Sequence, residues 1–251
     1  MPQTIGIVCG LKSEKHAIEK SLGRCELGDV DVRIGVSGAR ASQAGIIAND
    51  FAAEGAVALM SVGVSGGLDP SLSTGDLVIG ADVICVDGGA FKSDAAFVEK
   101  LDRYEGQMRT EENTLPAGSP QSSGPTHPLV FGRILGSDTI IQTPEQKAHL
   151  FDQLDAIAVD MESHAVASAA ERANIPFVAV RAIADTSNTV LPSPALDAVA
   201  PDGSTKVLST LTKAFMKPSS FPALIKLGQE SAIANDRLAT DIGPVLKLLF
   251  K

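Results

Sequence analysis

One stretch of the chain, residues 157–187 with the sequence IAVDMESHAVASAAERANIPFVAVRAIADTS, constrains the fold more than any other. Two short apolar runs rich in Val and Ile, residues 157–160 and 177–184, flank an alanine-rich segment, residues 161–173, that is long enough for one helix. Apolar runs joined in this way are typical of a parallel βαβ unit. The stretch therefore predicts an α/β fold in which these two strands are parallel neighbours.

An acidic residue follows each of these two strands. Glu162 comes just after the first strand and Asp185 just after the second. Neighbouring parallel strands end at the same edge of a sheet, where open α/β sheets bind their ligands. The two carboxylates are therefore expected at one site, although a role as a helix cap or a loop acid would explain either one alone.

A third acid follows the first predicted strand, residues 5–9. Ser13 is a plausible N-cap for a helix that reaches Leu22, and Glu14 would then lie in the first turn of that helix. A carboxylate is stabilised there by the helix dipole, which is a sufficient structural explanation by itself. Paired carboxylates also suit displacement at a sugar carbon, because one acid can protonate the leaving group while another activates water.

Composition excludes several classes of protein. The formal net charge is -9 and no cluster of Lys or Arg occurs, which argues against a nucleic-acid partner. The sequence after the first strand, GLKSE, is not a dinucleotide fingerprint, which disfavours an oxidoreductase. Three scattered cysteines without a CxxC pattern indicate a reducing compartment, and no run of about 18 apolar residues is present. We expect a cytoplasmic protein with no metal site.

The α/β pattern continues along the chain and predicts a single domain over residues 1–251. Residues 105–128 are rich in Pro, Gly and Ser and are expected to form a polar flap. Residues 203–251 are expected to be helical, with helices near 204–216 and 221–238 followed by an apolar tail. Thr143, Pro144 and Gln146 form a capping-box pattern that marks the start of a helix.

Three blocks, IGIVCGLKSE, VGVSGGLDPSLSTGDLVI and VDMESHAVASAAERANIPFVAVRAIADTS, occur in an order and at separations that resemble one enzyme superfamily. This is the superfamily of purine nucleoside phosphorylases and methylthioadenosine/adenosylhomocysteine nucleosidases. The loop after Asp185, the APDG turn and the KPSSFPALIKL stretch resemble its hopanoid-associated branch, which includes adenosylhopane nucleosidases. The resemblance implies a three-layer αβα sandwich around a mixed, largely parallel twisted sheet.

The resemblance also implies a role for each acid. Glu162 would accept hydrogen bonds from the ribose hydroxyls, with Met161 packed on the sugar face. Asp185 would protonate or hydrogen-bond the purine at ring nitrogen seven, and Glu14 would orient and deprotonate the attacking water. The base pocket would be formed by Ser137, Asp138, Ile140 and Ile141.

Three positions depart from the family pattern or fall outside it. The family serine aligns with Val64, so its contact is either lost or supplied by Ser65, next to Gly66 in the same turn. His164 is expected to have a structural role, packing on the helix. Arg181 is expected to form an ion pair and to point away from Asp185.

The resemblance implies cleavage of the N-glycosidic bond of a purine nucleoside that carries a 5' substituent. Hydrolysis is favoured because Glu14 is present and no Arg pair is evident for phosphate, although phosphate could serve as a co-substrate. No other cofactor is implied, and a homodimer is expected. The alternative is a nucleoside-binding accessory protein without activity, whose apolar C-terminal tail could touch a membrane.

Overall fold

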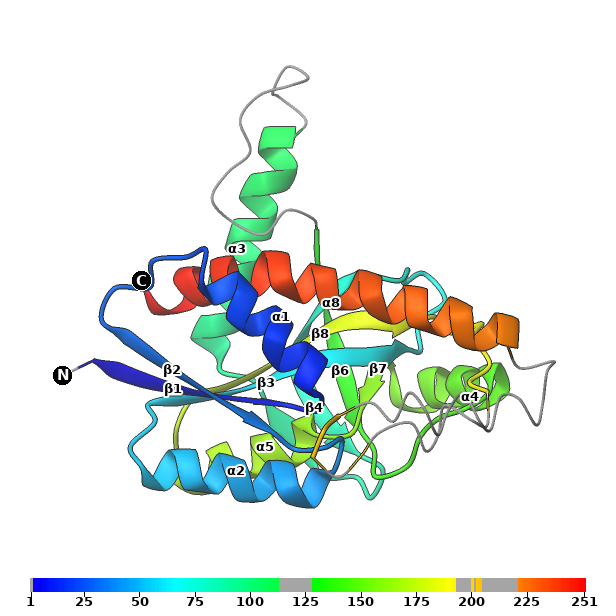
Figure 1. The fold of residues 1–251 in the computed structure, drawn as a ribbon, viewed down its shortest axis with the longest axis horizontal. Coiled ribbons are helices and arrows are strands. Elements are labelled where there is room, and N and C mark those ends of the chain that lie inside the picture. The colour runs from blue at the N-terminus through cyan, green and yellow to red at the C-terminus, as the bar shows by residue number, and fades with distance from the viewer. Residues whose placement is uncertain (1, 113–127, 193–199, 201, 205–220) are drawn as a thin grey trace.

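The computed structural model describes residues 2–112, 128–192, 200, 202–204 and 221–251. These residues form one mixed sheet with helices on both of its faces (Figure 1). The strands are β1 (Gln3–Cys9), β2 (Val30–Val36), β3 (Ala58–Gly67), β4 (Leu77–Cys85), β5 (Ala90–Lys92), β6 (Leu129–Gly136), β7 (Ala156–Asp160) and β8 (Phe177–Asp185).

Most strand pairs in the sheet are parallel. The strands β2, β1, β3 and β8 follow one another in parallel, as do β4, β6 and β7. Antiparallel pairing joins β8 to β4, β4 to β5, and the end of β3 to β7. The predicted fold class is confirmed by this mixed, largely parallel sheet.

The predicted pairing of residues 157–160 with residues 177–184 is wrong. The strand β8 pairs with β3 and β4, whereas β7 pairs with β6 and with the last two residues of β3. The end of β3 therefore lies between the ends of β7 and β8, with Gly66 opposite Val159 on one side and Asp185 on the other. This arrangement still brings the acids after both strands to one place.

The helices form two outer layers (Figure 1). On one face of the sheet α1 (Lys12–Leu22) packs against α8 (Phe221–Phe250), and on the other face α2 (Ala41–Ala53) packs against α5 (Ser163–Ala173). The helix α3 (Ala95–Glu112) projects from the body and contacts α8, where Phe97 meets Phe250 edge to face, and α4 (Pro144–Leu154) packs beside β7.

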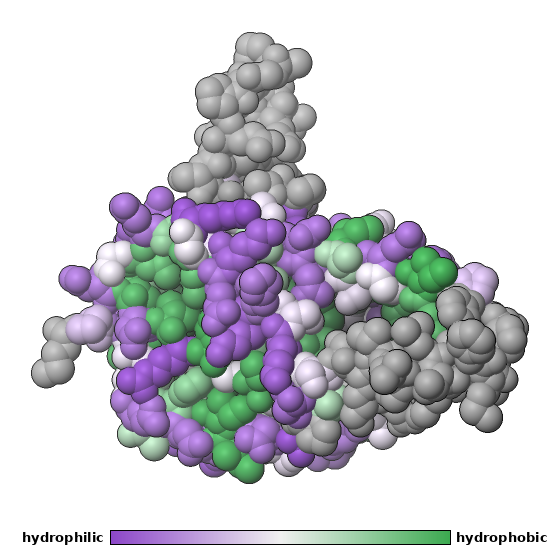
Figure 2. Space-filling model, in the orientation of Figure 1, coloured by the Kyte–Doolittle hydropathy of each residue, from purple (hydrophilic) through white to green (hydrophobic). Residues whose placement is uncertain are grey.

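The hydrophobic core is divided by the sheet into two main clusters. One contains Ile7, Ile18 and Ile242, between the sheet and the α1/α8 layer, and the other contains Leu59, Val166 and other residues facing the α2/α5 layer. All nine residues of β8 are buried, as expected for a central strand covered on both faces. Polar side chains cross the surface over α1, with smaller apolar areas beside them (Figure 2).

Three predicted element boundaries change. The helix α1 begins one residue before Ser13, with Leu11 as its N-cap residue. The helix α3 extends to Glu112, so the first third of the expected flap is helical, and residues 113–127 lie outside the described residues. The helix α8 continues through Pro244 to Phe250 as one element, and the expected helix near 204–216 lies outside the described residues.

Candidate active site

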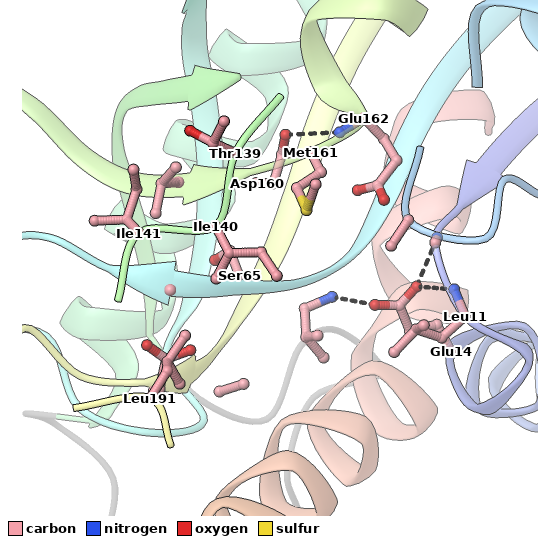
Figure 3. A pocket seen from close by; sticks show the side chains of 17 residues that line it. Leu11, Glu14, Ser65, Thr139, Ile140, Ile141, Asp160, Met161, Glu162 and Leu191 are labelled. Carbon is pink, nitrogen blue, oxygen red and sulfur yellow. Dashed lines mark hydrogen bonds between the residues drawn. The ribbon is translucent and has the colours of Figure 1, made fainter. Parts of the chain in front are cut away.

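A pocket of about 200 Å³ lies where β1, β3, β7 and β8 end, with α1 and the loop after β6 around it (Figure 3). The strand ends arrive from distant parts of the sequence because the sheet pairs them, so the pocket depends on the whole fold. It brings together most of the predicted site residues, which are Glu14, Ser65, Gly66, Ile140, Ile141, Met161, Glu162 and Asp185.

Glu14 is held in the pocket by three backbone N–H groups. Gly10 and Leu11 donate to Oε2 at 2.7 and 2.8 Å, and Val64 donates to Oε1 at 2.9 Å. The side chain is almost fully buried, and burial raises the pKa of Glu14 although these N–H groups oppose the shift. The carboxylate is therefore fixed in place, with lone pairs left over for a ligand.

Glu162 comes just before α5, at its N-cap position, but its side chain forms no capping hydrogen bond. Asp160 instead accepts hydrogen bonds from the backbone N–H groups of Glu162 and Ser163 and from the Ser163 hydroxyl. The Glu162 carboxylate is therefore free to face the pocket, as Figure 3 shows. Burial raises the pKa of Glu162 to about 8, although Arg181 opposes the shift.

Gly10 allows Glu14 and Glu162 to approach each other. A Cβ atom at Gly10 would lie 2.7 Å from Oε1 of Glu162 and 3.4 Å from Oε2 of Glu14. The first of these distances is too short for a real side-chain contact. Gly10 follows the first strand, and a side chain at this position would have to displace the Glu162 carboxylate.

Arg181 lies fully buried beneath these acids and forms the predicted ion pair. Its guanidinium pairs with Asp160, donates to the Ser61 hydroxyl, and lies 3.7 Å from Oε2 of Glu162. An Arg side chain is expensive to bury, and the paired carboxylates offset that cost. Arg181 therefore neutralises the acidic floor of the pocket without lining it.

Asp185 is the last residue of β8, and Lys147 of α4 forms an ion pair with its Oδ2 atom. Burial raises the pKa of Asp185, and the Lys147 ammonium opposes the shift. The sequence analysis missed Lys147. The only available signal was a lysine in the first turn of a helix, where the dipole disfavours a cation, and that signal is weak.

Two of the four residues predicted to form the base pocket line the cavity. Ile140 and Ile141 line the pocket together with Thr139, and they lie opposite Glu14 (Figure 3). The buried Ser137 hydroxyl donates to the Thr139 carbonyl at 2.8 Å, and Asp138 is exposed, so neither lines the pocket. The chain bends at Asp138 and Thr139, and the residues from Thr139 to Ile141 line the cavity instead.

Val64 stands at the position of the family serine, and Ser65 follows it. Val64 contributes its backbone N–H to Glu14, so the change of side chain leaves the acid in place. Ser65 lines the pocket, and its buried hydroxyl has no hydrogen-bond partner among the described residues. Such a hydroxyl is available to a ligand. Gly66, beside it, allows Asp185 to approach the end of β3.

His164 packs against Gly136, outside the pocket. Its Nε2 atom lies 3.6 Å from Oδ1 of Asp138, and a Cβ atom at Gly136 would collide with the imidazole. The predicted structural role of His164 fits this packing.

The charged side chains among the described residues that line the pocket are all acidic. Four carboxyl groups line it, and none of the described residues that line it is a Lys or Arg. Within the same described part of the chain, no group of three or more His, Cys, Asp or Glu side chains could hold a metal ion. No helix of that part is long and apolar enough to cross a membrane.

The chain is similar to known proteins of one superfamily. A family model described as the phosphorylase superfamily matches residues 4–214. Among curated proteins, a 5'-methylthioadenosine/S-adenosylhomocysteine nucleosidase of Staphylococcus haemolyticus is 28% identical over 134 residues, which are 52% of this chain and 57% of that protein. The protein of the same name from Mycobacterium bovis is 28% identical over 51% of this chain and 58% of its own length. The chain thus spans little more than half the length of these curated relatives.

Solved structures share the fold over nearly the whole chain. An S-adenosylhomocysteine nucleosidase from Streptococcus pyogenes, in complex with 5-methylthiotubericidin, superposes with a TM-score of 0.68 at 17% identity, covering 99% of this chain and 97% of that one. A Helicobacter pylori 5'-methylthioadenosine/S-adenosylhomocysteine nucleosidase gives a TM-score of 0.68 at 14% identity, covering 94% of each chain. At these identities the likeness establishes the fold.

Proposed function

Because this chain belongs to the phosphorylase superfamily, we propose that it cleaves the N-glycosidic bond of a purine nucleoside, releasing adenine from a 5'-substituted adenosine by hydrolysis. The observation that carries the proposal is the convergence of Glu14, Glu162 and Asp185 on one pocket from three separate elements. Each of the three residues is more than nine-tenths buried, and each carboxyl group has its own polar partners. Three acids in different surroundings can take three different roles.

The reaction assigns one role to each acid. Water attacks the anomeric carbon and gives a proton to Glu14, while the bond from that carbon to the purine nitrogen breaks. The electron pair of that bond passes to the purine, which takes a proton from Asp185. Glu162 accepts hydrogen bonds from the ribose hydroxyls, and Met161 packs on the sugar. The products are the free base and the ribose derivative, and exchange with solvent restores the protons on the acids.

The charge of the pocket favours water over phosphate as the nucleophile. A phosphate dianion would enter among four carboxyl groups with no Lys or Arg among the described residues that line the pocket. The nearest buried cations, Arg181 and Lys147, are already paired with Asp160 and Asp185. Water carries no charge and needs only a hydrogen-bond acceptor, which Glu14 offers.

The identity of the 5' substituent is proposed from the resemblance and not from the pocket, since Ile140 and Ile141 are assigned to the base. Adenosylhopane is the candidate suggested by the resemblance to the hopanoid-associated branch. A homodimer is expected from the same resemblance, and light scattering coupled to size exclusion would measure it.

The test is adenine release from a panel of 5'-modified adenosines in phosphate-free buffer, followed by base quantification. We expect turnover without phosphate, and large losses for Asp185→Asn and Glu162→Gln. Asp152→Asn on α4 and Glu171→Gln on α5 are matched controls on exposed positions and should keep wild-type activity. Absolute dependence on phosphate would eliminate hydrolysis, and full activity of either site variant would eliminate the role of that residue.

A further inference from the structure

Lys147 is a fully buried lysine that the proposed reaction does not use. It lies in the first turn of α4, where its ammonium pairs with Oδ2 of Asp185 and donates to the Thr186 carbonyl at 2.7 Å. Both contacts are with the end of β8 and the residue after it. The lysine thus reaches from one element to the residue that is expected to protonate the base.

This placement is costly for a purely structural group. A cation in the first turn of a helix opposes the helix dipole. Complete burial also removes its hydration, and an apolar residue of similar volume would often pack there at no loss of stability. The Asp185 carboxylate offsets this cost in free energy. The positive charge of Lys147 therefore points to a role at the candidate site.

The helix that carries Lys147 also belongs to the wall of the pocket. Its capping box is formed by Thr143 and Gln146, just after the pocket residues Thr139 to Ile141. The Gln142 carbonyl accepts a hydrogen bond of 3.0 Å from the N–H of Leu191, another pocket residue. The Lys147 contact therefore joins the wall that would face the base to the acid that would protonate it.

We propose that Lys147 is a positioning residue for Asp185, holding Oδ2 so that the base meets Oδ1. This inference rests on the proposed cleavage of a nucleoside. Lys147 touches neither the substrate nor the reacting atoms, and it acts through Asp185.

The pH dependence of the reaction gives the inference a specific readout. Among the described residues, Lys147 from α4 is the charged group in contact with Asp185, β3 presents the Gly66 backbone, and Glu14 and Glu162 lie elsewhere in the same pocket. Removing Lys147 removes the group that lowers the pKa of Asp185. Asp185 then keeps its proton to higher pH but donates it less readily.

The experiment compares pH profiles of kcat for adenine release by the wild type, Lys147→Met, Lys147→Gln and Lys147→Arg. We expect the alkaline limb of the profile, where kcat falls because Asp185 loses its proton, to move to higher pH by about one unit or more in the two neutral variants. A nearby opposite charge changes the pKa of a carboxyl group by about this much. We expect kcat at neutral pH to fall by up to about tenfold for each unit by which the acid is weakened. Lys147→Arg keeps the charge and should keep the limb near its wild-type position.

The matched control is Arg133→Met. Arg133 pairs with Asp82 and donates to the Leu154 carbonyl at 3.0 Å, so it ties the other end of α4 to the sheet, outside the pocket. This variant should lose stability without moving the alkaline limb. If Arg133→Met moved the limb as far as Lys147→Met does, general loosening of α4 would explain the effect and the inference would be overturned.

The two proposals fail in different ways. A folded wild-type protein that releases no base from any nucleoside would overturn the proposed function and the acid role with it. An active wild type with an unmoved alkaline limb in both neutral variants would overturn only the inference about Lys147.

A double-mutant cycle of Lys147→Met with Asp185→Asn, followed by urea midpoints, checks the pairing itself. We expect the double variant to lose less than the sum of the single losses, and simple additivity would contradict the pairing.

Discussion

The backbone N–H of Val64 donates a hydrogen bond of 2.9 Å to Oε1 of Glu14. The end of β3 thus holds an acid that belongs to the first turn of α1, and it does so without a side chain. The chemistry of the Val64 side chain is therefore secondary to the position of its backbone.

Glu14→Gln should be far more damaging than Val64→Ala. A glutamine amide would turn an NH2 group toward at least one of the three N–H donors, and it could not take a proton from water. We expect kcat to fall by at least about a hundredfold, as for loss of a general base, and the free energy of unfolding to fall by about 1–3 kcal/mol. Val64→Ala should keep most of the activity. Steady-state kinetics and urea unfolding measure both effects, with the exposed Glu19→Gln on the same helix as the control.

Glu162→Gln should change how stability depends on pH. Burial raises the pKa of Glu162 from its ordinary value of 4.5 to about 8, so between these values the folded protein holds a proton that the unfolded chain has released. The free energy of unfolding of the wild type therefore falls as pH rises through this window, by up to about 1.4 kcal/mol per pH unit for one proton. Glutamine does not titrate, so the variant should lose less stability from pH 5 to pH 8. Thermal melts at each pH measure the difference, and equal slopes for the two proteins would contradict the raised pKa. Glu171→Gln should follow the wild type.

Asp160→Asn should be among the most destabilising single changes near the pocket. It would leave the Arg181 guanidinium buried without its main partner, which costs about 3–5 kcal/mol for a buried pair. Urea unfolding of the variant gives the loss directly. Asp31→Asn removes one of the two exposed acidic partners of Arg33, the other being Glu54, and should cost less than about 1 kcal/mol. A similar small loss for both variants would show that Arg181 finds other compensation.

Ser65→Ala should weaken ligand binding while leaving the free energy of unfolding almost unchanged. The Ser65 hydroxyl is buried and has no partner among the described residues, so its removal should leave the free energy of unfolding within about 0.5 kcal/mol of the wild type. A ligand that uses the hydroxyl would lose one hydrogen bond of about 0.5–1.5 kcal/mol, which corresponds to a rise in KM of about three- to tenfold. An unchanged KM would remove Ser65 from the site.

Local signals in the sequence predicted most elements well. The Thr143 and Gln146 capping box starts α4 as expected, and the register of β4 with β6 shifts at Gly80, where a glycine inside a strand favours a bulge. These features depend on residues that are close in sequence, and their physical causes act over a few residues.

The features that the sequence did not reveal are all long-range. The pairing of β8 with β3 and β4 rather than β7 depends on how the whole sheet closes, which the βαβ pattern of one stretch does not encode. Lys147 meets Asp185 across 38 positions of sequence, and nothing beside Lys147 marks it. The bend at Asp138 and Thr139, which places Thr139 rather than Ser137 and Asp138 in the pocket wall, comes next to a long-range hydrogen bond from the Ser137 N–H to the Asp160 carbonyl.

The position of Gly66 between Val159 and Asp185 has a consequence for how the protein is made. A chain emerging from the ribosome displays Glu14 early, but β3 receives its last neighbour only when β8 has been synthesised. Every shorter nascent chain lacks one wall of the pocket. The pocket is therefore complete only after the eighth strand has taken its place in the sheet.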